Sequence, residues 1–458
     1  MATQPAEQSR RFDPDAFESF RFLGRDLDAE GCVALRYALD DEHEFLEEFD
    51  IPLRAPVSSQ LRERVDGLLS LLHWVAGVSY YKMAAPPTVG CEGELPTPAV
   101  ARLLESLYSE GLGEFAFVNK LAALPRPSFP SGPLDAPGPG PVALARDARV
   151  LVPIGGGKDS IVALETMRRS EHETVLFSVG NAPPMIRTER VAGLPRLIVN
   201  RRLDPRVHEL NLAGALNGHV PITAIVACVA LLTAALNGFE AVVMANERSA
   251  SSGNLHWDGI EVNHQFSKSL RAEDLLRAAL AQSAPGLELF SILRPASELS
   301  IARAFARLGE YHGSFTSCNA IFRLDPARRA GSWCCDCPKC RFVFLVLAPF
   351  SDPAHLREVF GRDLLQQEDQ FEGFALLTAT GGEKPFECVG EEQESLAAIR
   401  LLSEDPRWRG HRVLQRLIEE VLPLHPAPVG SPSSALTLSD RHRVPAHLMP
   451  YVDALLGA

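Results

Sequence analysis

The sequence lacks a hydrophobic run long enough to cross a membrane. Its longest apolar run, from Ile222 to Leu236, is fifteen residues long and contains two threonines, whereas a membrane-spanning helix needs about 20 apolar residues. The N-terminal stretch "MATQPAEQSRRFD" also lacks the apolar core of a secretory signal. We therefore expect a cytoplasmic protein without a membrane partner, in which the longest apolar run forms a buried helix.

An excess of positive charge is also lacking. The 458 residues include 45 lysines and arginines against 58 aspartates and glutamates, which gives a net charge of −13 at pH 7. A large nucleic-acid surface requires excess lysine and arginine to neutralise phosphates. We therefore expect no nucleic-acid partner, and no feature of the sequence indicates an obligatory protein partner.

Cysteines are few and unevenly placed, and internal repeats are absent. Five of the nine cysteines lie between Cys318 and Cys340, which does not resemble a secreted disulfide framework. Hydrophobic residues make up 46% of the chain and charged residues 22%, as is ordinary for a soluble globular protein. The length allows two or three domains.

Apolar runs and helical patterns alternate from Val150 onward. Predicted strands lie at 150–154, 174–179, 197–200, 241–245 and 289–293, and predicted helices at 161–169, 222–236, 270–281 and 298–308. Such alternation predicts an α/β fold with a doubly wound parallel sheet. In these sheets a ligand binds beyond the carboxyl ends of the strands.

Four segments are expected along the chain. Residues 1–124 are predicted to form an N-terminal α+β domain, with strands within 17–51 and helices near 61–80 and 98–121. Residues 125–147 contain seven prolines and are predicted to be a linker. Residues 148–350 are expected to form the doubly wound domain with the cysteine cluster, and residues 351–458 a mostly helical region.

A glycine turn follows the first strand of the doubly wound segment. Gly155, Gly156 and Gly157 are followed by Lys158, Asp159 and Ser160, and then by a predicted helix. Backbone N–H groups and the helix dipole make such a turn an anion site. A Walker A loop is excluded by Val152 and Asp159, and a dinucleotide fingerprint by Ser160.

The remaining match, Gly-Gly-x-Asp-Ser after a strand, resembles the PP-loop of ATP pyrophosphatases. That loop usually begins with Ser, where this chain has Gly155. The resemblance implies a fold of the PP-loop ATP pyrophosphatase type and cleavage of ATP to AMP and diphosphate. It implies that residues 155–160 bind ATP and that Lys158, Asp159 and Ser160 serve catalysis.

Further polar residues follow the fourth predicted strand. Glu247, Arg248 and Ser249 are expected at its carboxyl end as residues that bind ATP and its metal ion, where Glu247 could bind Mg²⁺ and Arg248 an anionic group. Lys268 lies near the start of the next helix and is a candidate for substrate binding. A solvated polar loop is the alternative interpretation.

Arginines gather within residues 187–206 of this acidic chain. They are Arg187, Arg190, Arg196, Arg201, Arg202 and Arg206. A basic cluster near the site suggests a polyanionic small substrate, with Arg201 and Arg202 as candidate contacts. Ordinary surface ion pairs would explain the same cluster.

Four cysteines have the spacing of a zinc site. Cys334, Cys337 and Cys340 follow the C-x₂-C-x₂-C pattern, and Cys318 could supply a fourth thiolate, leaving Cys335 spare. The arrangement is similar to the zinc knuckle of 7-cyano-7-deazaguanine synthases, which are also PP-loop enzymes. Reduced, buried cysteines without metal are the alternative.

The order of motifs along the whole chain resembles the UDP-N-acetyl-muramoyl-L-alanyl-L-glutamate epimerase family of bacterial cell-wall synthesis. The motifs are "FRFLGRDLD", "YYKMAAP", "GGGKDS", "ANERSAS", "VNHQFSKS", "CDCPKCRFVFL" and "KPFECVGE". The resemblance implies a small-molecule substrate whose terminal L-Glu is inverted to D-Glu with ATP and Mg²⁺, through an adenylated carboxylate. Candidate bases, by chemistry alone, are Cys388, His264, His312 and Glu387.

Two other functions fit part of the sequence. A nucleobase-modifying PP-loop enzyme, of the 7-cyano-7-deazaguanine synthase or tRNA thiolase type, would share the glycine turn and the cysteine cluster. A nucleotide-binding module without catalysis would account for Gly155 in place of Ser. A measurement of diphosphate release across the corresponding substrates distinguishes them.

Overall fold

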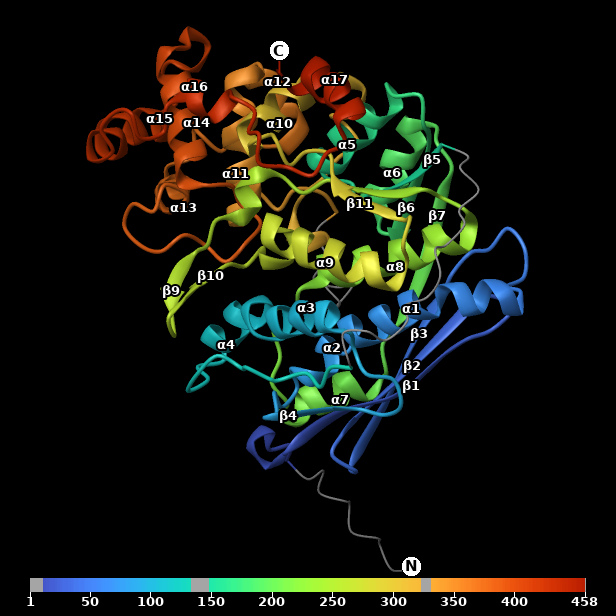
Figure 1. Cartoon of the computed structure of the whole chain (residues 1–458). Helices are drawn as coiled ribbons and strands as arrows, with labels where there is room; N and C mark the ends of the chain where they lie inside the picture. Colours follow the sequence, from blue (N-terminus) through green and yellow to red (C-terminus); the bar gives the residue numbers. More distant parts are fainter. Residues whose placement is uncertain (1–10, 133–147, 323–330, 458) are drawn as a thin grey trace, which may run out of the picture.

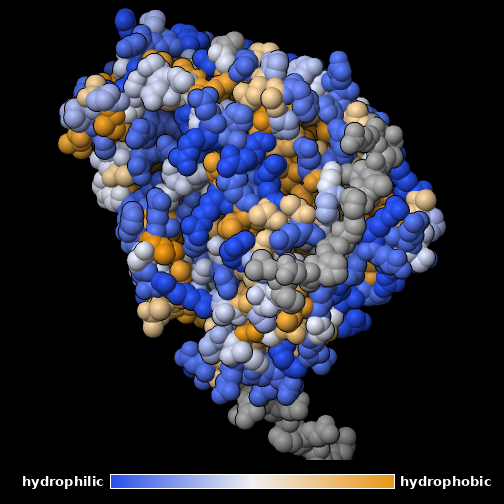
Figure 2. Space-filling model, in the orientation of Figure 1, coloured by the Kyte–Doolittle hydropathy of each residue, from blue (hydrophilic) through white to orange (hydrophobic). Residues whose placement is uncertain are grey.

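The computed structural model describes residues 11–132, 148–322 and 331–457. Most of the predicted proline-rich linker, residues 133–147, lies outside this part. Among the described residues no helix combines the length and apolar character needed to cross a membrane. On the face shown in Figure 2, hydrophilic residues dominate and hydrophobic residues appear as separate patches.

The N-terminal part combines strands with helices, as predicted. Its strands are β1 (Ser19–Leu27), β2 (Cys32–Leu39), β3 (His43–Asp50) and β4 (Thr88–Cys91), and its helices are α1 (Ser59–Ala76), α2 (Val78–Tyr81), α3 (Pro98–Tyr108) and α4 (Gly113–Val118). Alternation explains β2, in which Val33, Leu35 and Tyr37 are fully buried on one face. The Ser58 side chain accepts from the Leu61 N–H and so caps α1.

Parallel strands and helices alternate in the next part. The strands are β5 (Arg149–Pro153), β6 (Glu173–Val179), β7 (Arg196–Arg202), β8 (Ala241–Met244) and β11 (Glu288–Ser291). The helices between and after them are α5 (Lys158–Arg168), α6 (Pro183–Ala192), α7 (Arg206–Ala213), α8 (Ile222–Asn237), α9 (Leu270–Ser283) and α10 (Glu298–Phe305). The predicted strands and helices of this segment are therefore confirmed. A short hairpin, β9 (Leu255–Trp257) and β10 (Ile260–Val262), was not predicted.

One sheet of nine strands joins these two parts, in the order β11-β8-β5-β6-β7-β3-β2-β1-β4. Strands β11, β8, β5, β6 and β7 run parallel, and β3 continues the sheet antiparallel to β7. In chain order the five parallel strands are arranged 3-2-1-4-5, so the direction of winding changes between β5 and β8. Ligands bind at such switch points, beyond the carboxyl ends of the strands.

Both faces of the parallel strands are covered, as expected of a doubly wound sheet. Val150 and Val152 of β5 face a core shared with α5 and α10, whereas Leu151 faces a core shared with α8 and α9. Helices α1 and α3 pack on the outer side of α8 and α9 (Figure 1). The N-terminal part thus contributes to the covering of one face.

The described residues of the C-terminal part form helices joined by loops, without a strand. Helix α11 (Pro338–Leu347) precedes it, and its own helices are α12 (Pro353–Phe360), α13 (Phe371–Leu376), α14 (Glu392–Glu404), α15 (Arg412–Arg416), α16 (Pro432–Leu436) and α17 (Met449–Val452). Helices α11 and α14 share a core with α5 and α10. The C-terminal part therefore packs on the same face of the sheet as α5, the helix after the glycine turn.

Candidate active site

The glycine turn lies at the switch point, between β5 and α5. Gly156 has φ +82°, and a Cβ there would lie 2.4 Å from Pro184 Cβ. A Cβ on Gly157 would lie 2.7 Å from Ser317 Oγ, whereas nothing lies within 4 Å of one on Gly155. The close approach of neighbouring chain therefore requires glycine at 156, and leaves room at 155 for a serine side chain.

A cavity of about 320 Å³ opens beside the turn. Its lining includes Phe177 and Val179 of β6, Met244 of β8, Asp159, Ser160, Lys268, Thr316 and Ser317. The cavity has an apolar wall at the strand ends and a polar side at the helix N-terminus. Of the predicted site residues, the structure therefore brings Gly155, Gly157, Asp159, Ser160 and Lys268 together.

Lys158 points away from solvent into a buried ion-pair network. Its side chain is 0% exposed, and its ammonium pairs with the carboxylates of Asp159 and Glu298, the first residue of α10. Burial raises the pKa of Glu298, and the nearby Asp159 raises it further. Burial also acts to raise the pKa of Asp159, but Lys158 and Lys339 hold it below its usual value. Asp159 is thus the ionised carboxylate that faces the cavity.

Two more lysines connect this network to Cys388. The ammonium of Lys339 on α11 lies 4.0 Å from Glu298 Oε1 and donates to the backbone carbonyl of Cys388. The ammonium of Lys268, which lines the cavity, lies 3.5 Å from Cys388 Sγ. Burial acts to lower the pKa of Lys268, but Cys388 and nearby carboxylates raise it overall. Both lysines therefore place positive charge beside the thiol.

Cys388 lies next to a histidine–glutamate pair. Burial acts to raise the pKa of Cys388, but Lys268 and a hydrogen bond with His264 lower it to about 6. The hydrogen bonds from His264 to Cys388 and Glu114 outweigh burial and raise the pKa of His264 to about 9. His219, whose ring centroid is 4.5 Å from that of His264, has its pKa lowered to about 3 by burial and by His264. Cys388 and His264 are therefore a thiolate beside an imidazolium at neutral pH.

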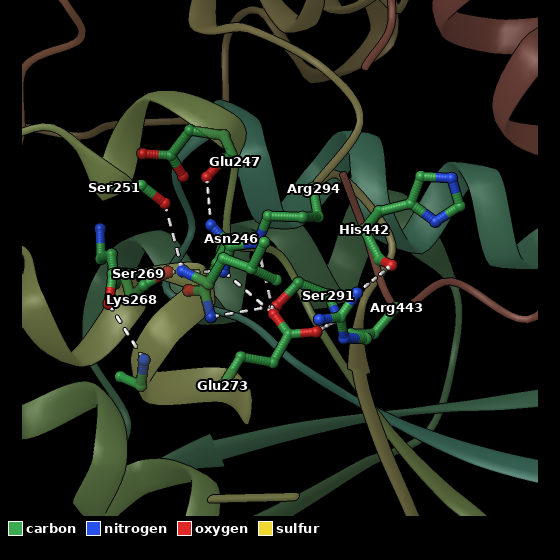
Figure 3. Close-up of polar contacts among 12 residues, drawn as sticks. Asn246, Glu247, Ser251, Lys268, Ser269, Glu273, Ser291, Arg294, His442 and Arg443 are labelled. Carbon is green, nitrogen blue, oxygen red and sulfur yellow. Dashed lines mark hydrogen bonds and ion pairs between the residues drawn. The ribbon is translucent and has the colours of Figure 1, made fainter. Parts of the chain in front are cut away.

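Glu247 follows β8 and is held by its backbone. Glu247 is 2% exposed, and its Oε1 has no hydrogen-bond partner among the described residues. The Arg294 guanidinium donates to the carbonyls of Glu247 and Lys268, at 2.5 Å each, and pairs with Glu273 at 3.0 Å. Figure 3 shows this cluster, with Asn246 bonded to Ser291 beside it. Arg294 thus fixes two site loops against α9.

Arg248 and Ser249 contact the C-terminal part rather than the turn. The Arg248 guanidinium donates to the carbonyls of Thr437 and Ala435, and Arg248 lines a separate, larger cavity. Ser249 donates to Glu394 Oε1 at 2.6 Å. Burial and the nearby Glu298 raise the pKa of Glu394 to about 7. The structure does not bring either residue to the lining of the smaller cavity, and their ATP-binding role stays a prediction.

Arg201 and Arg202 lie where β7 pairs with β3. Arg201 pairs with the buried Glu47 at 2.5 Å and donates to Ser79, and Arg202 pairs with Glu48 and Asp50. Neither lines the smaller cavity. These ion pairs account for both arginines within the fold, and their contact with substrate stays a prediction.

The four predicted zinc ligands lie together. The sulfur atoms of Cys318, Cys334, Cys337 and Cys340 are all within 4.8 Å of one another. Cys335 points elsewhere, and its thiol donates to the carbonyl of Phe360. The spacing of four thiols around one point is the donor set of a closed zinc site.

The fold places His312 apart from the other three candidate bases, whereas His264, Glu387 and Cys388 lie together. His312 bonds to His355 and to the carbonyl of Phe305, outside both described cavities. Glu387 accepts from the Lys339 N–H at 3.1 Å. His264 and Cys388 adjoin the cavity through Lys268.

Several site residues were missed from the sequence. They are Glu114, His219, Arg294, Glu298 and Lys339. None belongs to a motif with a known mechanism, and each reaches the site from a separate element. Lys339 does lie inside the cysteine pattern, between Cys337 and Cys340, and that position was the one available signal.

The fold and site define an α/β protein with a glycine turn and an adjoining cavity at the switch point of its sheet. Residues 11–292 match the family model described as the MurL N-terminal domain, and residues 314–428 match the MurL C-terminal domain. The chain belongs to the MurL family, which confirms the resemblance inferred from its motifs.

Three relatives share nearly the whole chain, and each is named UDP-N-acetyl-alpha-D-muramoyl-L-alanyl-L-glutamate epimerase. The protein of Salinispora tropica is 48% identical over 91% of both chains. That of a Micromonospora species is 44% identical over 98% of this chain and 99% of its own. That of Xanthomonas oryzae pv. oryzae is 38% identical over 97% of this chain and 98% of its own.

Proposed function

We propose that this protein inverts the terminal L-Glu of UDP-N-acetyl-muramoyl-L-alanyl-L-glutamate to D-Glu, using ATP to adenylate the α-carboxylate. The names of three relatives with near-complete coverage support the epimerase activity and its role in peptidoglycan precursor synthesis. The observation that carries the adenylation step is the cavity at the switch point, which combines the glycine turn with Asp159 and Lys268. We further propose a fold of the PP-loop ATP pyrophosphatase type and a cytoplasmic location.

The cavity suits a nucleotide. Phe177, Val179 and Met244 offer an apolar wall to a planar base. The phosphates then lie at the turn, where the N-terminus of the eleven-residue helix α5 favours negative charge. Lys268 supplies a cation on the same side of the cavity. These features support ATP rather than an uncharged ligand.

Mg²⁺ fits two carboxylates, one at the turn and one directly after β8. Glu247 is buried with an unpartnered Oε1, and Asp159 is ionised and faces the cavity. Carboxylate oxygens are the ligands that Mg²⁺ prefers, and Glu247 and Asp159 would hold it. When bound, Mg²⁺ neutralises charge on the phosphates of ATP.

Adenylation makes the α-proton of glutamate accessible to a base. In the free carboxylate, loss of that proton would place a second negative charge beside the first. In the adenylate the carboxyl is a neutral acyl group, so the electron pair delocalises onto its oxygen. Each unit by which the pKa of the α-proton falls is worth about 1.4 kcal/mol. Hydrolysis of the adenylate then releases the D-product and AMP.

In this proposal the residues of the chain orient the reacting groups and neutralise their charge. The carboxylate attacks the α-phosphorus of ATP, the bond to the β-phosphate breaks, and diphosphate leaves. Lys268 stabilises charge that develops on the phosphates. Lys158, on the buried side of the turn, keeps Asp159 ionised and oriented. The Ser160 hydroxyl donates to the Gly157 carbonyl and so stabilises the conformation of the turn.

We also propose a structural zinc ion on the four cysteines. Four sulfur atoms close to one point fit tetrahedral zinc, and a site with four protein ligands leaves no open position for chemistry. Its role is then to hold the segment around Cys318 against the start of α11. The same helix carries Lys339 into the charged network.

Incubation of the protein with ATP, Mg²⁺ and the UDP-muramoyl dipeptide in D₂O tests the proposal. The expected result is AMP, diphosphate and a D-Glu product with one deuterium on its α-carbon. Exchange is expected to require ATP. Release of diphosphate with 7-carboxy-7-deazaguanine or tRNA instead would favour the nucleobase-modifying alternative, and equal exchange without ATP would contradict the adenylation step.

A further inference from the structure

Cys388 stands apart from the other cysteines because charged residues from several parts of the chain contact it. Lys268 precedes α9 and lies 3.5 Å from its sulfur, and Lys339 on α11 binds its carbonyl. His264, from the segment after β10, bonds to its side chain. Glu114 on α4 and Glu387 on the adjoining loop are the carboxylates of this environment.

Resting on the proposed function, we infer that the Cys388 thiolate is the base that removes the α-proton of the adenylated glutamate. His264 and Glu114 are positioning residues that hold the sulfur in its ionised form. The location supports this role, because Lys268 contacts the sulfur and also lines the cavity that contains the glycine turn. The sulfur and the site of adenylation are thus one lysine side chain apart.

The remaining candidate bases are less suited by their contacts. The imidazole of His264 contacts both the Glu114 carboxylate and Cys388, with a pKa raised to about 9, so it holds its proton at neutral pH. Glu387 is tied to the Lys339 N–H. His312 bonds to His355 on a different part of the molecule. A thiolate with a pKa of about 6 is deprotonated under the same conditions.

The step conserves atoms and charge. The α C–H bond breaks, an S–H bond forms on Cys388, and the electron pair moves into an enolate with the acyl oxygen. A proton from water then adds to the opposite face of the α-carbon, and the thiol returns its proton to water. In D₂O this sequence places one deuterium on the product.

Comparison of two partial reactions in the full-length protein tests this inference. Cys388→Ala and Cys388→Ser are expected to lose α-deuterium incorporation by about 10²- to 10⁴-fold. Both are expected to retain ATP–diphosphate exchange, dependent on the UDP-muramoyl dipeptide, within about two-fold, because the sulfur acts after adenylation. Cys32→Ala, on β2 in the antiparallel part of the sheet away from the turn, is the matched control and should keep both reactions.

The pH profile separates positioning from a merely structural role. Deuterium incorporation by the wild-type protein should rise with pH around 6, the pKa of Cys388. In His264→Gln the rise should move toward the ordinary thiol value of 9.0, with ATP–diphosphate exchange little changed. An unmoved profile would contradict the role of His264.

Two results would overturn the inference about Cys388. The first is deuterium incorporation at the wild-type rate in Cys388→Ala, and the second is loss of both partial reactions in Cys388→Ala and Cys388→Ser. If instead the wild-type protein itself showed neither ATP–diphosphate exchange nor ATP-dependent deuterium incorporation, the proposed function would fail.

Discussion

Replacement of Lys158 by methionine should destabilise the fold as well as reduce the activity. The ammonium is fully buried between Asp159 and Glu298, and the Glu298 side chain is only 1% exposed. Removing one partner of a buried ion pair costs about 3–5 kcal/mol. Lys339 remains 4.0 Å from Glu298, and Asp159 is 21% exposed, so we expect about 3 kcal/mol near pH 7.5.

The loss should shrink as the pH falls. The pKa of Glu298 in the folded protein already lies above its usual value of 4.5, and removal of Lys158 raises it further. A carboxyl group with a raised pKa in the folded state costs stability as the pH rises above 4.5, and costs none when it is protonated in both states. The difference between Lys158→Met and wild type should therefore be smaller at pH 5 than at pH 7.5.

Urea unfolding followed by circular dichroism measures these free energies. Lys158→Met combined with Glu298→Gln removes both charges and should recover about 1–2 kcal/mol of the loss. Arg62→Gln, which breaks an exposed ion pair with Asp26, is the control and should unfold like wild type. If Lys158→Met unfolds at the wild-type urea concentration at both pH values, the buried ion pairs of Lys158 do not stabilise the fold.

Three further predictions concern the turn and the cysteines. Asp159→Ala should abolish AMP formation with an unchanged circular dichroism spectrum, and more than a tenth of wild-type activity would exclude Asp159 from the mechanism. Gly156→Ala should weaken ATP binding at least about ten-fold, because a Cβ at φ +82° meets Pro184, whereas Gly155→Ser should bind ATP as well as wild type in calorimetry. Purified protein should contain about one equivalent of zinc, lost in Cys337→Ser, and its absence from protein prepared without chelator would favour reduced thiols without metal.

Much of the fold could be predicted because its signals are local. Apolar runs at 150–154 and 241–245 became β5 and β8 within a residue or two, and the fifteen-residue apolar run became α8. The pairing of β3 with β7 could not be predicted, because it joins segments about 150 residues apart. The arginine cluster was a sequence signal of this pairing, since Arg201 and Arg202 pair with acidic residues of β3.

The residues of the candidate site could likewise be predicted only in part. The glycine turn, Asp159 and Lys268 could be found because position after a strand predicts a place at one edge of the sheet. Glu298 and Lys339 could not, because a charged residue on a helix is ordinarily a solvated one. The packing of α10 on α5, and of α11 on α10, buries these two charges beside the turn.

The pairing of β3 with β7 has a consequence for dissecting this protein. A fragment ending before β5 would leave β3 with a free edge of unpaired N–H and C=O groups, and the complementary fragment would leave the same on β7. Such open edges pair with other chains and promote aggregation. Each fragment would also uncover the contact of α1 with α8. The two fragments are therefore expected to be recovered together, as a complex reassembled after co-expression, more readily than either fragment alone.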